Sequence, residues 1–258
     1  MLTDVIIELD AIYKTYQSGT GPIGALEDIT LSVGQGEFLS VVGPSGCGKS
    51  TLLKIIAGLV PASAGRVNVL GKPVQGPYPD YGIVFQHPVL LGWRTVLDNV
   101  LLQVEVRRLQ KASFVQSARE ILSFAGLDGF ENKYPNELSG GMQQRVSICR
   151  ALIHNPSILL MDEPFGALDA MTREAMNQEI QRIWLTQKKT VVFVTHSIAE
   201  AVFLSDRVVV MSPRPGRIEG VYEIDLGRPR DLDLTASSAF GAHVSRIRRA
   251  IGSRAAVD

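Results

Sequence analysis

Short apolar runs alternate with longer segments of helical periodicity along most of the chain. Several of the short runs are apolar throughout, as is typical of strands covered on both faces of a sheet. The predicted strands are Val5–Leu9, Ile29–Val33, Phe38–Val42, Val67–Leu70, Gly82–Phe85, Ile158–Met161, Val191–Val194 and Arg207–Met211. The predicted helices are Lys49–Ala57, Val96–Arg108, Phe114–Ala125, Gly141–Ile153, Asp169–Gln187 and Ile198–Leu204. This alternation favours an α/β fold.

The predicted sheet is interrupted in the middle of the chain. Residues 88–153 contain no convincing strand, and strand-like sequence resumes at Ile158. We therefore expect a helical insert within an α/β sheet domain. Residues 213–230 are rich in Pro, Gly and Arg and predict an irregular tail, after which an amphipathic helix is predicted from about Ala239 to Ser253.

The composition is that of an ordinary globule, and it argues against nucleic-acid binding. The chain has 258 residues, enough for one large domain or two small ones. Hydrophobic residues make up 45% and charged residues 20%, which is unlike a disordered chain. The 26 Lys and Arg residues are balanced by 26 Asp and Glu residues. Because generic nucleic-acid binding depends on a basic excess, we expect no nucleic-acid partner.

Targeting signals and disulfides are also not expected. No apolar run approaches the ~18 residues needed to span a bilayer. The first ten residues have no basic region ahead of their apolar stretch, so we expect no secretory signal. The two cysteines, Cys47 and Cys149, argue against a disulfide scaffold and fit a reducing compartment.

One glycine-rich segment has the pattern of a phosphate-binding loop. It lies between a predicted strand and a predicted helix and reads Gly43-Pro44-Ser45-Gly46-Cys47-Gly48-Lys49-Ser50. Its glycines allow the main chain to approach a phosphate, and the helix N-terminus attracts the anion. We expect the phosphates of a ligand to bind these residues and Thr51, with Lys49 on the outer phosphates and Ser50 on Mg²⁺. Cys47 is either a reactive thiol or simply a small residue that suits a tight loop. A glycine-rich turn that only caps a helix is the alternative.

Two acids and a histidine follow other predicted strands. Asp162 and Glu163 end the strand-like run Ile158–Met161, at the kind of position where α/β sheets bind ligands. Paired with the phosphate loop, Asp162 can hold Mg²⁺ and Glu163 can polarise an attacking water. His196 lies just beyond Val191–Val194 and is a candidate γ-phosphate contact. The alternatives are an acidic turn that meets solvent and a structural histidine.

A second candidate anion site precedes another helix. The segment reads Leu138-Ser139-Gly140-Gly141-Met142-Gln143-Gln144-Arg145. Ser139 suits a helix N-cap, and the glycines allow close approach of the main chain. Met142, Val146, Cys149 and Ile153 recur at helical spacing, so this is a further exposed helix N-terminus suited to an anion.

With this segment the sequence resembles the ATP-binding subunits of ABC transporters, whose signature it carries. The resemblance covers essentially the whole chain and implies a single ABC ATPase domain over residues 1–258. The implied fold is α/β, a phosphate-loop NTPase (RecA-like) with a mostly parallel sheet core, an antiparallel β part and an inserted α-helical subdomain. The implied parts are a core at about 1–87 and 154–225, a helical subdomain at about 88–153, and a C-terminal tail and helix at about 226–258.

The resemblance also implies roles for single residues. Tyr16 resembles the aromatic residue that stacks on adenine, and Gln86 the loop glutamine that contacts Mg²⁺ and the transport partner. Ser139, Gly140 and Gly141 are expected to contact the γ-phosphate held by a second copy, so that two ATP molecules lie between two head-to-tail chains. The segment Phe165-Gly166-Ala167-Leu168-Asp169 would join the two sites. The catalytic residues expected on this basis are Glu163, His196, Gln86 and Lys49, and the Mg²⁺ ligands are Ser50, Gln86 and Asp162.

The segment after Gln86 resembles the nitrate, sulfonate and taurine importer branch of this family. It reads His-Pro-Val-Leu-Leu-Gly-Trp-Arg-Thr-Val, with Gly92 where that branch commonly has proline. The resemblance implies integral membrane permease subunits as partners and, indirectly, a periplasmic or lipoprotein solute-binding protein. It implies a peripheral location at the cytoplasmic face of the inner membrane. Because the chain stops at 258, we expect no extra regulatory domain like that of sugar-importer cassettes.

Other interpretations remain open at the level of the sequence. The chain could be a soluble ABC ATPase acting on ribosomes or DNA, although such proteins usually carry two cassettes or coiled-coil inserts. It could also be the cassette of a lipid or efflux transporter. Trp93 could pack inside the helical insert or line a groove for the membrane subunit. The basic residues Arg246, Arg248 and Arg249 predict a solvated helix face, with contact to an anionic membrane surface as the alternative.

Overall fold

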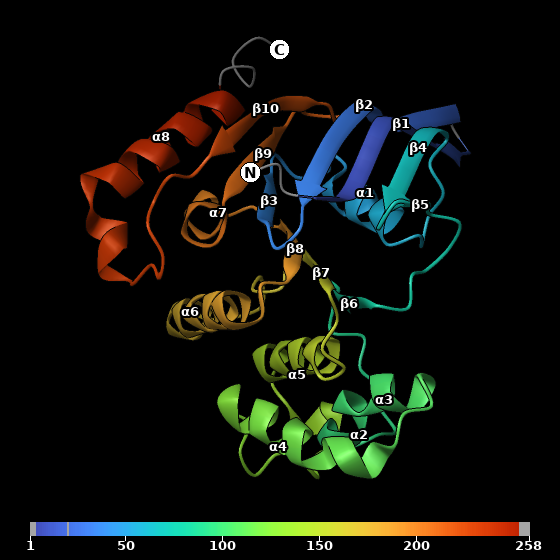
Figure 1. Ribbon diagram of the computed structural model, residues 1–258, viewed down its shortest axis with the longest axis vertical. Coiled ribbons are helices and arrows are strands. Elements are labelled where there is room, and N and C mark those ends of the chain that lie inside the picture. Colours follow the sequence, from blue (N-terminus) through green and yellow to red (C-terminus); the bar gives the residue numbers. More distant parts are fainter. Residues whose placement is uncertain (1–3, 20, 253–258) are drawn as a thin grey trace. The chain divides into compact units, whose positions relative to one another are not determined.

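The chain contains two compact units, the first comprising Met1–Pro79 with Asn177–Asp258 and the second Asp80–Met176. A computed structural model describes residues 4–19 and 21–252 (Figure 1). Strands and helices alternate as expected, with both parallel and antiparallel pairing. The predicted α/β class is therefore confirmed.

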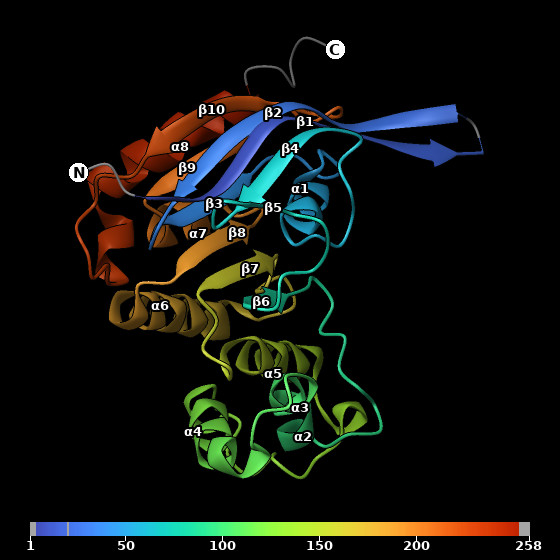
Figure 2. The same ribbon diagram turned by 45° about the vertical axis from the view of Figure 1, so that its right-hand side comes forward.

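Four antiparallel strands form one sheet of the first unit, in the order β2-β1-β4-β5 (Figure 2). Their bounds are β1 Val5–Ser18, β2 Gly21–Gly34, β4 Ala64–Val69 and β5 Lys72–Pro73. Ile7 and Leu9 are buried and flank an exposed residue, as do Ile29 and Leu31 on β2. The predicted strands covered only these apolar halves of β1 and β2. The rest of the hairpin is largely exposed and contains register shifts, so it lacks a clear alternation.

The phosphate loop is positioned by a buried parallel sheet in the same unit. Strand β3 (Phe38–Val42) pairs in parallel with β8 (Thr190–Val194) on one side and with β9 (Arg207–Met211) on the other. Strand β10 (Ile218–Glu223) pairs antiparallel with β9. The predicted irregular tail at 213–230 is therefore wrong in part. Every second residue of β10 is exposed, and the Pro, Gly and Arg residues around it obscured that alternation.

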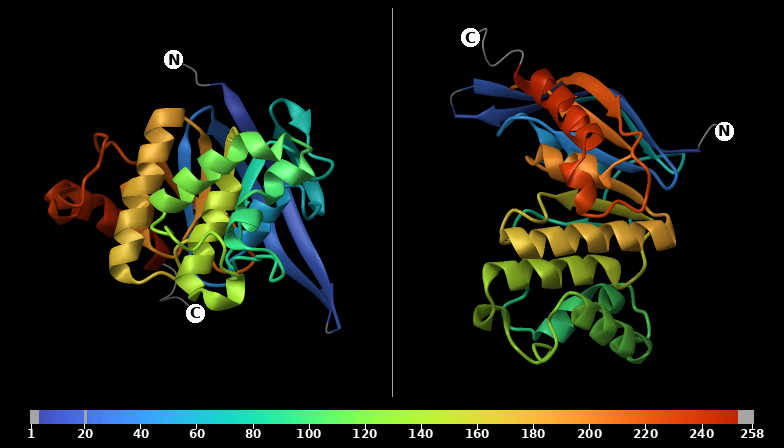
Figure 3. Two further views of the ribbon diagram at one scale, coloured as in Figure 1. Left: turned by 90° about the horizontal axis from the view of Figure 1, so that it is seen from below. Right: turned by 90° about the vertical axis from the view of Figure 1, so that its left-hand side faces the viewer.

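Helices join and cover these strands. Helix α1 (Lys49–Ile56) follows β3, and α7 (Ile198–Leu204) follows β8. Helix α8 (Ser238–Gly252) packs against α7, β9 and β10 (Figure 3). The predicted end of this helix at Ser253 lies outside the described residues. Helix α6 (Ala170–Gln187) runs through the point in the sequence where the second unit gives way to the first.

The second unit combines a short parallel strand pair with a helical cluster. Strand β6 pairs in parallel with β7, and their bounds are Tyr81–Val84 and Ile158–Asp162. The helices are α2 Val96–Val100, α3 Leu102–Val106, α4 Val115–Phe124 and α5 Gly140–Leu152. They bury an apolar core that includes Val100, Leu122 and Val146. No strand occurs between residues 88 and 153, as predicted, but the expected helix Val96–Arg108 is divided at Leu101.

A buried arginine, Arg230, binds the C-terminal tail of the first unit to α6 and to the end of α7. Arg230 is only 2% exposed, and its guanidinium donates hydrogen bonds to the carbonyls of Val202, Phe203 and Ser205 at 2.7–3.0 Å. Its backbone N–H and carbonyl pair with the side-chain amide of Gln181 at 2.8 and 2.7 Å. Burial lowers the pKa of Arg230 to about 10, so the side chain is still charged at neutral pH. This residue thus satisfies carbonyls at the end of α7 that would otherwise be left without a donor.

We expect the substitution Arg230→Ala to lower the free energy of unfolding by more than about 2 kcal/mol, because each buried carbonyl left unsatisfied costs about 1–3 kcal/mol. Arg248→Ala is the matched control, since Arg248 is exposed on α8, and should change the free energy by less than about 0.5 kcal/mol. Urea denaturation followed by circular dichroism measures both. Equal stability of the two variants would contradict the assigned role of Arg230.

Candidate functional site

The phosphate loop leaves a strand that is buried along its whole length and enters a helix directly. All residues of β3 are buried, and Lys49 is the first residue of α1. Gly46 and Gly48 have φ angles of +75° and +102°, in the left-handed region where a side chain causes strain. The predicted order of strand, glycine-rich loop and helix is therefore present.

Two glycines of the loop also make room for neighbouring main chain. A Cβ atom placed on Gly43 would lie 2.8 Å from the carbonyl oxygen of Met211, and one on Gly48 would lie 2.7 Å from that of Ala25. No heavy atom lies within 4 Å of the corresponding position on Gly46. The loop is thus closely packed at both ends and open at its apex, which allows a phosphate to approach the main chain there.

Lys49 is held inside the loop and is only 6% exposed. Its Nζ donates hydrogen bonds to the carbonyl oxygens of Gly43 and Pro44, both at 2.9 Å, and lies 3.8 Å from Sγ of Cys47. Burial raises the pKa of the Cys47 thiol, although the ammonium group of Lys49 opposes the shift. The thiol is therefore protonated at neutral pH, which favours a small packing residue over a reactive one at this position.

His196 leaves the sheet at the same edge as the phosphate loop. Strands β3 and β8 are parallel neighbours in which Val41 lies opposite Val194. Gly43 and His196 each follow this pair by two residues, so both emerge at the carboxyl ends of their strands. The hydroxyl of Thr195, which precedes His196, donates to a carboxylate oxygen of Glu200 at 2.6 Å and fixes the turn into α7. The His196 side chain itself is exposed.

The predicted carboxylates and Gln86 come together in the second unit. Val84 of β6 lies opposite Met161 of β7, and Gln86 and Glu163 each follow by two residues. The Gln86 side-chain amide donates to Oε2 of Glu163 at 3.4 Å. Glu163 has a φ angle of +45°, an uncommon conformation for a residue other than glycine and one that is often found at functional sites. Asp162, one residue earlier, is buried at the end of β7.

The predicted signature segment begins α5 with a serine cap. The Ser139 hydroxyl accepts a hydrogen bond from the N–H of Met142 at 3.3 Å. Gly140 is exposed and has no neighbouring heavy atom within 4 Å of a Cβ position, whereas Gly141 packs against Leu168. The predicted N-cap is confirmed, and the helix presents an open N-terminus suited to an anion.

Two side chains of α5 that the sequence did not single out as functional bind the loop that follows β6. The Gln144 side-chain amide donates to the carbonyl of Phe85 at 3.1 Å. Arg150, which is buried, donates to the carbonyls of Pro88 and Val89, both at 2.8 Å. The loop that contains Gln86 is therefore attached to the signature helix at both of its ends. No signal in the local sequence identifies these two residues, because the burial of Gln144 and Arg150 follows from the fold.

Tyr16 and Trp93 are both exposed aromatic residues. Tyr16 lies on β1 opposite Ile23 and is 39% exposed, with Nζ of Lys14 4.9 Å from the centre of its ring. Trp93 is 76% exposed, so packing within the helical insert is wrong for this residue. At the C-terminal helix, Arg248 and Arg249 are exposed, which agrees with a solvated face.

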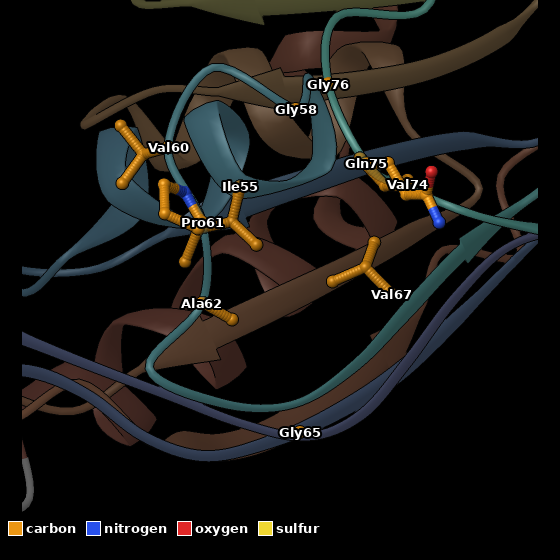
Figure 4. Close-up of a pocket in the computed structure, with 10 residues that line it drawn as sticks. All are labelled: Ile55, Gly58, Val60, Pro61, Ala62, Gly65, Val67, Val74, Gln75 and Gly76. Atoms are coloured by element: carbon orange, nitrogen blue, oxygen red, sulfur yellow. The ribbon is translucent and has the colours of Figure 1, made fainter.

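The predicted site residues are distributed over both units. The first unit carries Tyr16, His196 and the loop from Gly43 to Thr51. The second unit carries Gln86, Asp162, Glu163 and residues 139–141. A cavity of about 400 Å³ in the first unit contains none of them (Figure 4). It lies between the end of α1, β4 and the segment 74–76, and its walls expose polar as well as apolar atoms.

A Mg²⁺ ion fits the chemistry of the predicted ligands. In the part of the chain that the structure describes, no three His, Cys, Asp or Glu residues form a metal cluster. Mg²⁺ does not need such a cluster, because it prefers one or two protein oxygens completed by phosphate and water. The Ser50 hydroxyl and the Asp162 carboxylate are ligands of this kind. Within residues 4–19 and 21–252, no helix has the length and apolar character required to cross a membrane.

The chain is similar to known proteins over most of its length. Residues 26–166 match the ABC transporter family. An uncharacterised ABC transporter ATP-binding protein, MJ0412 of Methanocaldococcus jannaschii, is 51% identical over 88% of this chain and 85% of its own length. The nitrate import ATP-binding protein NrtD of Synechococcus elongatus is 45% identical over 88% and 84%, respectively. The taurine import ATP-binding protein TauB of Rhizobium johnstonii is 48% identical over 80% and 79%.

A solved structure has the same fold. It is the dimeric post-hydrolysis state of the ATP-binding cassette MJ0796 bound to ADP and Pi. It superimposes with a TM-score of 0.79 at 35% identity and covers 86% of this chain and all of that one. Taken with the phosphate loop and the serine-capped signature helix, these matches show that the chain belongs to the ABC transporter family, as one of its ATP-binding, ATP-hydrolysing subunits.

Proposed function

We propose that this chain drives an importer for a small anion such as nitrate, sulfonate or taurine. The observation that carries the proposal is the presence of two phosphate-binding features on one chain. One is the glycine loop at 43–50, and the other is the open helix N-terminus at Ser139. A single triphosphate held by one chain needs only the first, so the second is suited to the triphosphate of a neighbouring copy.

The proposed reaction is in-line attack of water on the γ-phosphate of ATP. Lys49 stabilises negative charge on the outer phosphates, and Glu163 orients or deprotonates the attacking water. Gln86 and His196 complete the polar surroundings of that water. Ser50, Gln86 and Asp162 would hold Mg²⁺, and the ion, when bound, would neutralise charge on the phosphate oxygens. The 3.4 Å hydrogen bond from Gln86 to Glu163 supports the role of this carboxylate, because it orients the group at the ligand-binding edge of its strands.

The proposed active form is a head-to-tail homodimer with two bound ATP molecules. In this arrangement the phosphate loop of one copy and residues 139–141 of the other contact the same triphosphate. The dimeric state of the similar cassette MJ0796 with ADP and Pi supports this arrangement. Tyr16 would stack on adenine, and its exposed ring leaves a face for such contact. A monomer should then bind ATP but hydrolyse it poorly.

The proposed partners are integral membrane permease subunits, with a solute-binding protein acting indirectly. The similarity to nitrate and taurine import proteins supports an importer for small anions. Trp93 and Val89 are strongly exposed in the segment that follows Gln86. Exposed apolar side chains of this kind suit a partner contact, and α5 holds this segment through Arg150. We therefore place the chain at the cytoplasmic face of the inner membrane as a peripheral subunit.

We expect Glu163→Gln to retain ATP binding and to lower ATP turnover by more than about 100-fold, because a positioned base contributes about 10²–10⁴ to rate. ATP should also trap this variant as a closed dimer. Phosphate release and size-exclusion chromatography with ATP measure the two effects. Glu120→Gln is the matched control, since Glu120 is exposed on α4 and bonded only locally to Gln116. Normal turnover of Glu163→Gln would remove Glu163 from its proposed role.

A mixture of two inactive variants tests the shared site. Lys49→Ala and Ser139→Ala should each be nearly inactive as homodimers. An equal mixture should recover up to about a quarter of normal turnover, because half of the dimers are mixed and each has one intact composite site. The separate variants at the same total concentration are the controls. Failure of every mixing ratio to restore turnover would contradict the shared arrangement.

Purification from the native membrane tests the transport role. The tagged chain should co-purify with a multi-spanning membrane protein, and mass spectrometry of the associated binding protein should identify a bound small anion. Loss of this association in Trp93→Ala, with normal ATP binding retained, would support the proposed contact. Recovery of ribosomes, or DNA, in place of a membrane protein would overturn the importer proposal.

A further inference from the structure

The turn between β9 and β10 lies against the phosphate loop. Gly216 in this turn is buried, and its N–H donates to the carbonyl of Ala25 at 3.0 Å. Its carbonyl accepts from the N–H of Glu27 at 2.9 Å, which makes a parallel bridge with Leu26. The turn is therefore joined to β2 by two main-chain hydrogen bonds.

The same short piece of β2 also contacts the phosphate loop. A Cβ atom on Gly48 would lie 2.6 Å from a methyl carbon of Leu26 and 2.7 Å from the carbonyl oxygen of Ala25. Residues 25–27 are thus in contact with Gly48 on one side and with Gly216 on the other. This arrangement places the turn beside the main chain of the loop.

The closest approach is between Gly216 and Cys47. A Cβ atom on Gly216 would lie only 2.0 Å from the carbonyl oxygen of Cys47 and 2.7 Å from Cε of Met211. The φ angle of Gly216 is not in the left-handed region, so the turn itself would accept an ordinary residue. Glycine is therefore required here by the space that the phosphate loop occupies, and not by the backbone conformation of the turn.

The turn is held in place by hydrogen bonds and an ion pair of its own. The N–H of Ser212 donates to the carbonyl of Arg217, and the N–H of Arg217 donates to the hydroxyl of Ser212, both at 2.9 Å. The guanidinium of Arg217 also pairs with Glu27 at 2.5 Å. The apex of the phosphate loop at Gly46, in contrast, faces open space. A group added at Gly216 would therefore press on the Cys47 peptide group from a turn that is itself held in place.

We infer that Gly216 is a positioning residue. It determines the position of the Cys47 peptide group and, through it, the direction in which the N–H groups of the loop point. The inference rests on the proposed role of residues 43–51 in binding the phosphates of ATP. Gly216 itself need not touch the nucleotide. It contacts the loop from the turn between β9 and β10. This turn lies in the segment 213–230, which the sequence predicted to be an irregular tail.

The variant Gly216→Ala tests this inference through two separate readouts. We expect the dissociation constant of ADP, measured by calorimetry, to rise at least tenfold. We also expect alkylation of Cys47 by iodoacetamide, followed by peptide mass spectrometry, to become several-fold faster because the loop no longer shields the thiol. Alkylation of Cys149, which is buried in the second unit, should not change.

Gly24→Ala is the matched control. Gly24 lies on β2 beside the same turn, and a Cβ atom there would be 3.6 Å from Cβ of Pro215, an ordinary contact. This control should bind ADP and react with iodoacetamide as the unsubstituted chain does. Unchanged ADP binding and unchanged Cys47 alkylation in Gly216→Ala would overturn the inference. A parallel rise at Cys47 and Cys149 would overturn it as well, because it would indicate general loosening.

A measurement on the unsubstituted chain covers the case in which Gly216→Ala does not fold. ADP should slow hydrogen exchange in the peptide that contains residues 212–217 as well as in the phosphate loop. Protection confined to the loop would overturn the inference. If the unsubstituted chain did not bind ADP at all, the proposed function would fail, whereas the alkylation experiment would still test the contact between Gly216 and Cys47.

Discussion

Parallel strand pairing is the constraint on which the candidate site depends. Because parallel neighbours end at the same edge of a sheet, residues far apart in sequence emerge beside one another. In the first unit this pairing brings the phosphate loop and His196 to one edge of the sheet. In the second unit it brings Gln86 within hydrogen-bond distance of Glu163. Backbone hydrogen bonds between parallel strands therefore determine where these candidate site residues lie.

Much of this could be predicted from the sequence, because the relevant elements are buried or rich in glycine. The strands β3 and β9 are apolar throughout or nearly so, and their predicted bounds are confirmed. The phosphate loop and the cap at Ser139 were identified from local residue patterns. These patterns depend on interactions between residues only a few positions apart in the sequence. Elements of this kind need no tertiary information for their prediction.

The parts that could not be predicted depend on contacts between distant segments. Strand β10 is an edge strand whose pairing with β9 compensates for a weak local pattern. Arg230 and Arg150 resemble surface arginines in sequence, and only the fold shows that they bind buried carbonyls. Gly216 resembles an ordinary turn residue until the position of Cys47 is known. The residues around such a glycine do not indicate which distant segment of the main chain will pack against it.

The attachment of the loop after β6 to helix α5 has an evolutionary consequence. Gln144 and Arg150 bind only carbonyl oxygens of residues 85, 88 and 89, and every amino acid has such a carbonyl. Side chains in this stretch can therefore be exchanged without releasing the attachment. A lineage can remodel the outward surface of the segment to suit a different partner, while the geometry that the helix imposes on its backbone is inherited unchanged.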